Sequence, residues 1–491
     1  MKMLHFKEFR FSMLFALATS LAAFTSCGGG SDEPDPTPNP GGNDEYVDIK
    51  MVSTNPSEGQ EVDAATNTIT VTYNYDVELA SGAGATLNGN SVSLSTSGKD
   101  LKASVTLEAG KSYTFEVPAS AVKAKGYRSY APAVKLSFKT TPKQADPSQI
   151  TANLCNPNSN DAAKALYKLL LDNYGKKTFS AVMADVNWNN NIADKIFNLT
   201  GKYPAMNCYD FIHIYVPKQQ WTWIDYYDIT PVTEWANAGG IVSLMWHFNV
   251  PLNEQTVPGE DGSGVTCTPS ETTFKAANAL KDGTWENKWF NEQIDKVADV
   301  MLKLQEAGIA ALWRPFHEAA GNYYATGYKG AAWFWWGADG PDTFKALWKA
   351  LYDKLDARGV KNLIWVWTSQ NTNNGSATKD SAFYPGKDLV DIVARDYYGG
   401  NLNDLVTDFN ELGADYSDKM VALGECGYGT NGNKVNEMPD MSKIWADGGH
   451  YLYAMGWYGG GKVAGTTNTM MSDSWWKNFM SMPEVLNRGD F

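Results

Sequence analysis

The feature that most constrains the fold is a regular alternation of short apolar segments with amphipathic segments, from about residue 147 to the end of the chain. The amphipathic segments carry apolar residues at helical spacing, as in the run Phe290, Ile294 and Val297. Repeated strand and helix patterns are typical of a parallel sheet covered by helices. Eight segments have the strand pattern, namely residues 178–183, 203–208, 241–246, 310–314, 362–367, 391–395, 420–424 and 451–456.

Eight consecutive strand–helix units predict a (β/α)₈ barrel over residues 147–491. The active site of such a barrel lies at the carboxyl ends of its strands, so the residues just after each predicted strand are the candidates for chemistry. An open, doubly wound sheet is the alternative fold. No glycine-rich phosphate-binding turn, which that fold often carries, follows the first predicted strand.

Residues 46–142 have a different pattern, in which apolar and polar residues alternate one by one. Ile69, Val71 and Tyr73, for example, alternate with threonines. Side chains two positions apart share one face of a strand, so we expect half-buried strands and an immunoglobulin-like β-sandwich. The segment contains no Trp and no cluster of reactive residues. We expect it to be a spacer, with carbohydrate binding as the alternative.

The N-terminus has the layout of an export signal, because basic residues precede an apolar stretch, 11–24, that is short for a membrane span. The stretch ends in small residues and Cys27, which resembles the lipidation signal of bacterial lipoproteins. We expect a signal peptide over residues 1–26, lipidation at Cys27 and a flexible tether over residues 27–45. Cleavage near another small residue, with release of an unlipidated protein, is the alternative.

The acidic patch after Cys27, residues 31–35, resembles the export signal of some Gram-negative surface lipoproteins. The expected location is therefore the outer membrane, at the cell surface, with a lipid anchor as the only membrane contact. A periplasmic or secreted protein is the alternative.

Net charge and cysteine content argue against several classes of function. The formal charge of −14 disfavours nucleic acid and anionic lipid as partners, because both select for clustered Lys and Arg. Only four cysteines follow Cys27, too few for a disulfide framework, although one or two disulfides remain open. None of them has the C-x-x-C spacing of a zinc site, and we expect no metal.

Polar and aromatic residues lie at the carboxyl ends of five predicted strands. In a barrel these ends face one mouth, so the side chains should surround a single site. They are Trp246 and His247 at the third strand, Arg314, His317 and Glu318 at the fourth, Asp396, Tyr397 and Tyr398 at the sixth, Glu425 at the seventh and Trp457 at the eighth.

Glu318 and Glu425 are the carboxylates best placed for acid–base chemistry. Cleavage of a glycosidic bond needs such a pair, one protonated to donate to the leaving oxygen and one to attack or stabilise the sugar carbon. A separation of about 5–5.5 Å between the carboxyl groups gives retention of configuration, whereas about 6.5–9.5 Å gives inversion. For either residue alone, a salt bridge with a neighbouring Arg or Lys is the alternative.

The sequence around the first glutamate favours catalysis. Residues 314–321, Arg-Pro-Phe-His-Glu-Ala-Ala-Gly, followed by the aromatic run 333–337, resemble the acid/base signature of glycoside hydrolase family 26, whose members use a retaining mechanism on this barrel. The family places a His before its acid/base, matched by His317, and its nucleophile in a Gly-Glu strand end, matched at Glu425. The resemblance implies Glu318 as acid/base and Glu425 as nucleophile.

The same resemblance, over about residues 150–490, implies a set of sugar-binding residues. Tyr398 would contact the nucleophile, and Trp457 would lie beneath the reacting sugar. The stretch before Trp333 is longer than the family spacing, so Tyr323 is a rival for its place. The full set of candidates is Trp246, His247, Arg314, His317, Trp333, Tyr398 and Trp457.

The function implied by the resemblance is an endo-β-1,4-mannanase that hydrolyses mannan or another mannose-containing hemicellulose without a cofactor. β-Glucan and xylan are alternative substrates within the family, and a non-catalytic glycan-binding surface lipoprotein is the alternative of another class. Position 321 is Gly, so the His317-Glu318 pair does not continue into the zinc-binding H-E-x-x-H motif. Neighbouring glycan-uptake proteins are candidate partners.

Overall fold

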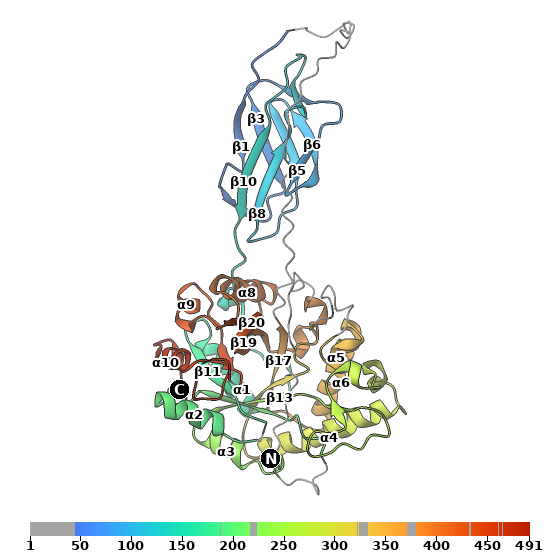
Figure 1. The fold of residues 1–491 in the computed structure, drawn as a ribbon, viewed down its shortest axis with the longest axis vertical. Helices are drawn as coiled ribbons and strands as arrows, with labels where there is room; N and C mark the ends of the chain where they lie inside the picture. Colours follow the sequence, from blue (N-terminus) through green and yellow to red (C-terminus); the bar gives the residue numbers. More distant parts are fainter. Residues whose placement is uncertain are drawn as a thin grey trace. The chain divides into compact units, whose positions relative to one another are not determined.

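The computed structural model describes residues 45–186, 188–216, 223–321, 323, 332–370, 380–431, 434–459, 461–463 and 465–491. They form two compact units, one ending at Lys143 and the other spanning Gln144–Phe491 (Figure 1). Each unit has its own hydrophobic core. Cys27, the expected signal peptide and the tether up to residue 44 lie outside the described residues.

The N-terminal unit consists of strands, which confirms the immunoglobulin-like fold expected from its alternating sequence. Ile69, Val71 and Tyr73 of β3 are buried, while the threonines between them are partly exposed. The strands pair in the order β1-β3-β7-β6-β5-β8-β10-β2, with β4 paired to β9. They are β1 (Met51–Asn55), β2 (Glu61–Val62), β3 (Thr68–Tyr73), β4 (Val77–Leu79), β5 (Ala85–Leu87), β6 (Asn90–Ser97), β7 (Asp100–Ser104), β8 (Ser112–Val117), β9 (Val122–Ala124) and β10 (Val134–Thr140).

The C-terminal unit is a closed (β/α)₈ barrel, as the eight strand patterns predict. Its parallel strands follow the order β11-β12-β13-β16-β17-β18-β19-β22, and β22 pairs with β11 to close the barrel. Each predicted strand segment overlaps one of them. They are β11 (Thr178–Met183), β12 (Met206–Asp210), β13 (Ile241–Trp246), β16 (Ala311–Pro315), β17 (Leu363–Gln370), β18 (Ile392–Tyr398), β19 (Met420–Gly427) and β22 (Tyr453–Gly456). Short strands β14 (Val250–Pro251), β15 (Val265–Thr266), β20 (Gly429–Asn431), β21 (Lys434–Asn436) and β23 (Val485–Leu486) complete the unit.

Amphipathic helices cover the outside of the barrel. The longest, α4 (Trp285–Glu306), buries Phe290, Ile294 and Val297, the residues whose spacing predicts it. The Thr284 side chain caps α4 by accepting a hydrogen bond from the backbone N–H of Asn287. The other helices are α1 (Asp161–Asn173), α2 (Asn191–Thr200), α3 (Thr230–Asn237), α5 (Trp335–Ala338), α6 (Pro341–Ala357), α8 (Leu402–Asp415), α9 (Met441–Ala446) and α10 (Asp473–Ser481). Short 3₁₀ helices lie at Pro147–Gln149, Pro269–Glu271, Ala276–Leu280, Ser381–Phe383 and Lys387–Leu389.

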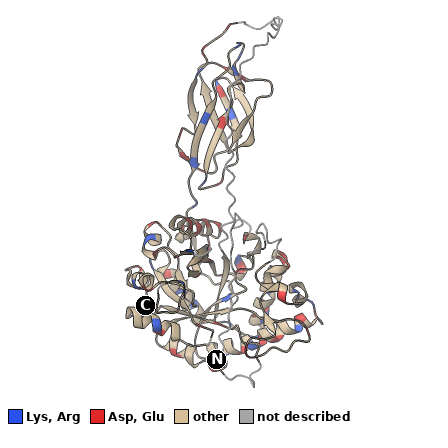
Figure 2. Cartoon of the chain, viewed as in Figure 1, with Lys and Arg blue, Asp and Glu red and all other residues tan. Residues whose placement is uncertain are grey.

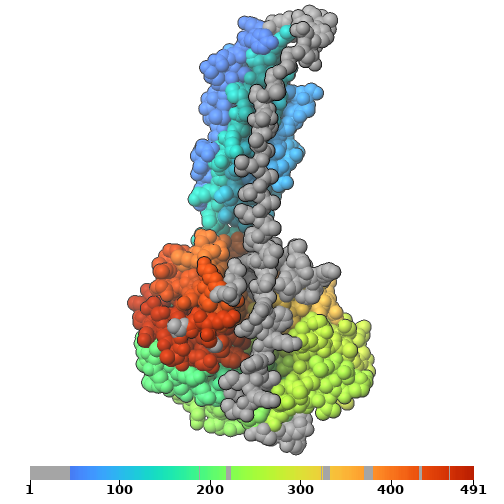
Figure 3. Space-filling view, viewed as in Figure 1, coloured from blue at the N-terminus to red at the C-terminus, as the bar shows by residue number. Residues whose placement is uncertain are grey.

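Acidic and basic residues are interspersed along the ribbon of both units (Figure 2). In the space-filling view, the orange and red C-terminal segments and the yellow-green segments lie on opposite sides of the barrel unit (Figure 3). Cys155, Cys208, Cys267 and Cys426 are free thiols, so the disulfides left open by the sequence do not form between them. Among the described residues, no helix is long and apolar enough to cross a membrane.

Candidate active site

Three carboxylates from different strands meet at the carboxyl end of the barrel. Glu318 follows β16, Asp396 lies in β18 and Glu425 lies in β19. One carboxylate oxygen from each of the three residues lies within 4.8 Å of the other two, and all three side chains are buried. Barrel closure thus brings together Glu318 and Glu425, which are far apart in the chain.

Arg314, buried in β16, lies between two of these carboxylates. Its Nη1 donates to Oδ2 of Asp396 at 3.1 Å, and its Nη2 donates to Oε1 of Glu425 at 2.5 Å. Burial alone would lower the pKa of the guanidinium, but the charges of Asp396 and Glu425 raise this pKa well above its usual value. Arg314 therefore gives the site a stable positive charge.

The same cluster is a group that could hold a metal ion, since Glu318, Asp396 and Glu425 could each offer an oxygen. Oxygen ligands of this kind suit Mg²⁺ or Ca²⁺. Arg314 already binds an oxygen of Asp396 and an oxygen of Glu425. The guanidinium of Arg314 therefore already supplies a positive charge to two of the three carboxylates.

Glu318 combines an uncommon backbone conformation with a raised pKa. Its φ is 52°, in the left-handed region that residues with a side chain rarely adopt, and its backbone N–H donates to the carbonyl of Thr368 in β17 at 3.1 Å. Burial raises the pKa of Glu318 well above its usual value, and the charges of Asp396 and Glu425 add to this rise. A carboxyl group that retains its proton in this way can serve as a general acid.

Glu425 is held by Arg314 and by Tyr398, whose hydroxyl donates to Oε2 at 2.5 Å. Its place depends on an irregularity in β19, where Leu423 pairs with Arg395 and Glu425 pairs with Asp396, so that Gly424 is skipped. A Cβ at Gly424 would lie 2.6 Å from Oδ1 of Asp396. Glycine at this position therefore permits the close approach of the two carboxylate-bearing strands.

His247 is held by Asp210, a residue that no sequence pattern singled out. Asp210 is buried at the end of β12, and its carboxylate accepts hydrogen bonds from the backbone N–H of His247 at 2.9 Å and from ring Nδ1 at 2.5 Å. The predicted second strand stopped at residue 208, whereas β12 ends at Asp210. The rule that strand ends carry the site would have found Asp210 if that boundary had been two residues later.

His317 lies between His247 and the nucleophile candidate. The ring centroids of His317 and His247 are 4.6 Å apart, and Nε2 of His317 lies 3.9 Å from Oε1 of Glu425. Burial lowers the pKa of His317 well below its usual value, and the positive charge of Arg314 acts in the same direction. His317 is therefore neutral at physiological pH.

Two aromatic candidates are partly exposed. Trp457 lies beside His247, with 6.0 Å between ring centroids. Trp333 packs over Gly321, where a Cβ would lie 2.4 Å from the indole ring. Its rival Tyr323 instead packs edge-on against Phe383, at 5.4 Å between ring centroids.

Trp246 does not lie with the other candidates in the cleft, contrary to the expectation from its place at a strand end. Its side chain is only 1% exposed, and its ring stacks on Phe248 with 3.7 Å between centroids. Successive side chains of a strand point to opposite sides. Because His247 faces the site, Trp246 and Phe248 face the opposite side of the strand, where Phe248 stacks on Phe290 of α4.

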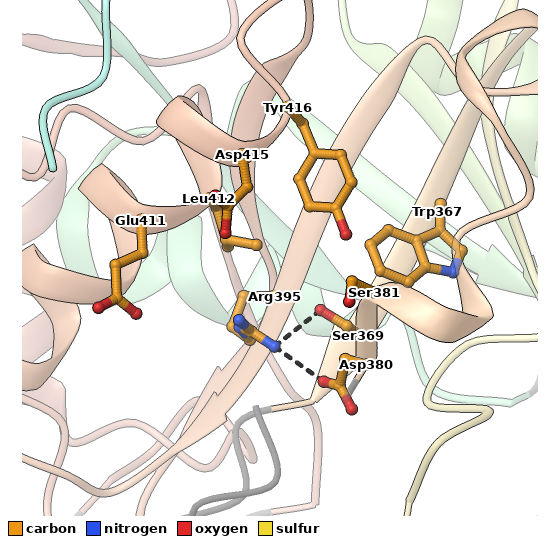
Figure 4. A pocket seen from close by; sticks show the side chains of 9 residues that line it. All are labelled: Trp367, Ser369, Asp380, Ser381, Arg395, Glu411, Leu412, Asp415 and Tyr416. Carbon is orange, nitrogen blue, oxygen red and sulfur yellow. Dashed lines mark hydrogen bonds and ion pairs between the residues drawn. The ribbon is translucent and has the colours of Figure 1, made fainter. Parts of the chain in front are cut away.

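A second ion cluster involves Arg395, the neighbour of Asp396 in β18 (Figure 4). Arg395 donates to both carboxylate oxygens of Asp408 in α8, at 2.8 and 2.9 Å, and to Asp380 at 3.0 Å. The cluster borders a cavity of about 140 Å³ that none of the predicted site residues lines. Burial raises the pKa of Asp380 to about 7, against the opposing charge of Arg395.

The family model described as glycosyl hydrolase family 26 matches residues 155–470, and the model of a bacterial Ig-like domain matches residues 47–140. A mannan endo-1,4-beta-mannosidase of Thermothelomyces thermophilus is 32% identical over 356 residues, which cover 71% of this chain and 64% of that protein. Mannan endo-1,4-beta-mannosidase B of Piromyces sp is 32% identical over 290 residues, 57% of this chain and 45% of that protein. The chain thus spans about half to two thirds of the length of these relatives.

Two solved structures are similar to the barrel unit. The family 26 domain of an endo-beta-mannanase/endo-beta-glucanase from Prevotella bryantii is 50% identical with a TM-score of 0.64, covering 69% of this chain and 99% of that chain. A beta-mannanase from a symbiotic protist of the termite Reticulitermes speratus, complexed with gluco-manno-oligosaccharide, is 28% identical with a TM-score of 0.53, covering 70% of this chain and 98% of that chain.

Proposed function

Because the chain belongs to glycosyl hydrolase family 26, we propose that it is a retaining endo-β-1,4-mannanase that hydrolyses mannan or a mannose-containing hemicellulose. The observation that carries the reaction type is the close approach of Glu318 and Glu425: an oxygen of one carboxylate lies within 4.8 Å of an oxygen of the other. So close an approach supports direct attack by one carboxylate, because the carboxyl groups of inverting enzymes stand about 6.5–9.5 Å apart to leave room for a water.

In the first step, an oxygen of Glu425 attacks the anomeric carbon and forms a glycosyl–enzyme ester. The bond from that carbon to the leaving oxygen breaks, and Glu318 gives its proton to this oxygen. Arg314 and Tyr398 bind one oxygen each of Glu425 and so fix the direction of its attack.

In the second step, Glu318, now ionised, takes a proton from water, and the water oxygen attacks the anomeric carbon. The ester bond to Glu425 breaks, which releases the sugar with its original configuration and restores both carboxyl groups. The raised pKa of Glu318 keeps the free enzyme ready to donate, so kcat/KM should fall as the pH rises through that pKa.

We propose mannan as the substrate because two relatives and two solved structures similar to this chain carry mannanase or mannosidase in their names. β-Glucan is a second candidate, because an endoglucanase H of Acetivibrio thermocellus is 32% identical over 124 residues, 23% of this chain. Release of reducing ends from mannan, lichenan and xylan compares the substrates directly. Product lengths over time distinguish internal cleavage from attack at chain ends.

Replacing Glu425 by Gln tests the assignment of the nucleophile. Glu425→Gln should abolish hydrolysis of mannan while binding of mannooligosaccharide, measured by calorimetry, persists. Glu318→Gln should lower turnover by about a hundred- to ten-thousandfold, the usual contribution of a general acid. Glu286→Gln, which changes another buried glutamate in α4, is the matched control and should retain activity. Full activity of Glu425→Gln would contradict the mechanism.

We also propose that the N-terminus directs export and that Cys27 carries a lipid anchor, with the enzyme at the outer surface of a Gram-negative cell. The support is the basic and apolar leader followed by Cys27 and an acidic patch. Cys27→Ser should move the protein from the membrane fraction to the soluble fraction, and protease treatment of intact cells should degrade the unaltered protein. Membrane association that survives Cys27→Ser would exclude this anchor.

A further inference from the structure

Asp210 and His247 form a close contact beside the reacting carboxylates. The two carboxylate oxygens of Asp210 have different partners: Oδ1 accepts from the backbone N–H of His247 at 2.9 Å, and Oδ2 contacts ring Nδ1 at 2.5 Å. Asp210 is 3% exposed, so water does not compete strongly for these bonds. One carboxylate therefore fixes both the backbone and the ring of His247.

This contact determines which ring nitrogen carries the proton. An ionised carboxylate can only accept hydrogen bonds, so Nδ1 must be the donor. In a neutral imidazole, Nε2 is then left as a hydrogen-bond acceptor. The ring of His247 lies among the rings of His317, Phe334 and Trp457, with centroid distances of 4.6, 5.9 and 6.0 Å. The His247 side chain is partly exposed, whereas the Asp210 side chain is buried.

We propose that Asp210 is a positioning residue that sets the proton position and the orientation of the His247 ring, one of the sugar-binding candidates. The expected effect of Asp210 on catalysis rests on the proposed glycosidase function. Asp210 acts through the imidazole.

Asp210→Asn tests the proposal with little change of volume. The amide oxygen can still accept from the backbone N–H of His247, which turns the amide NH₂ toward Nδ1. Nδ1 must then accept, and the proton moves to Nε2. We expect kcat/KM on mannooligosaccharide to fall at least about tenfold, because Nε2 would donate instead of accept and Asp210 would no longer hold the ring in its native orientation.

A double-mutant cycle separates action through His247 from a general structural role. If Asp210 acts through the imidazole, adding Asp210→Asn to His247→Ala should cause no further loss of kcat/KM. Additive losses would overturn the proposal.

Asp391→Asn is the matched control. Asp391 is also buried, and its carboxylate accepts from the backbone N–H groups of Cys155 and Trp365. It lies just before β18, at the opposite end of the barrel from the site. Asp391→Asn should leave kcat unchanged.

Nitrogen NMR of the His247 ring provides a readout that does not depend on activity. Nδ1 should carry the proton in the unaltered protein, and Nε2 should carry it in Asp210→Asn. An unchanged tautomer, or activity of Asp210→Asn within about twofold of the parent, would overturn the proposal. If the parent protein were inert on every glycan, the proposed function would fail, while the tautomer measurement would still decide the role of Asp210.

Discussion

At the scale of single residues, Arg314 is the group on which the charge balance of the site depends. It is fully buried and binds Asp396 and Glu425. Burial raises the pKa of Asp396 well above its usual value, and the charge of Glu425 adds to this rise, while the charge of Arg314 opposes it. Removing the guanidinium would leave these carboxylates together in a medium that solvates charge poorly. The site is therefore sensitive to this one side chain.

Arg314→Met should destabilise the barrel unit by about 3–5 kcal/mol, the usual effect of breaking a buried ion pair from one side. Arg358→Met is the control, because Arg358 pairs with Asp295 and Asp299 at the surface and should contribute about 1 kcal/mol or less. Urea unfolding followed by tryptophan fluorescence measures both, since every Trp lies at or after Trp188 and reports on the barrel unit. Equal losses for the two variants would contradict this account.

At the scale of elements, the pairing of β18 with β19 places the nucleophile candidate. Gly424→Ala should displace Asp396, because the added Cβ would lie 2.6 Å from its Oδ1. We expect a loss of about 1–3 kcal/mol in stability, typical of overpacking, and a lower kcat. Gly84→Ala is the control, since a Cβ there meets nothing within 4 Å. Calorimetry and initial rates compare the two, and an unaffected kcat in Gly424→Ala would refute the steric argument.

The Arg395 cluster predicts a pH dependence of the barrel's stability. The pKa of Asp380 is raised to about 7 in the folded state, from a usual value of 3.8, chiefly by burial. The stabilising contribution of its protonated form is therefore complete below about pH 4 and is lost as the pH rises through about 7. Asp380→Asn cannot ionise, so its stability relative to the parent should increase between about pH 4 and pH 8. Parallel urea-unfolding midpoints across this range would contradict the prediction.

At the scale of the whole molecule, the two units have separate cores. No residue belongs to both hydrophobic clusters among the described residues. Residues 144–491 alone should therefore fold and hydrolyse soluble mannooligosaccharide with kcat/KM within about twofold of the full chain. If the N-terminal unit is a spacer, the truncated protein should also keep its activity on insoluble mannan. If the unit binds carbohydrate, its removal should lower that activity. Failure of the truncated protein to fold would contradict the independence of the units.

The sequence alone predicted eight strand segments, each of which overlaps a barrel strand, and the strand ends that carry Glu318 and Glu425, because strand and helix patterns are local properties of the chain. It also predicted the half-buried strands of the N-terminal unit from the alternation seen in Ile69, Val71 and Tyr73. These features depend on which neighbours in the chain are apolar. They do not require knowledge of which distant residues meet.

Only the tertiary structure decided how those strand ends meet. Three contacts join different strands of the closed barrel. They are the close approach of Glu318 and Glu425, the ion pairs of Arg314 with Asp396 and Glu425, and the contact between Asp210 and His247. Trp246, at a strand end like His247, turns away from the site because adjacent strand residues face opposite sides. Barrel closure and strand register set these contacts, and both arise from packing of the whole sheet rather than from any single segment.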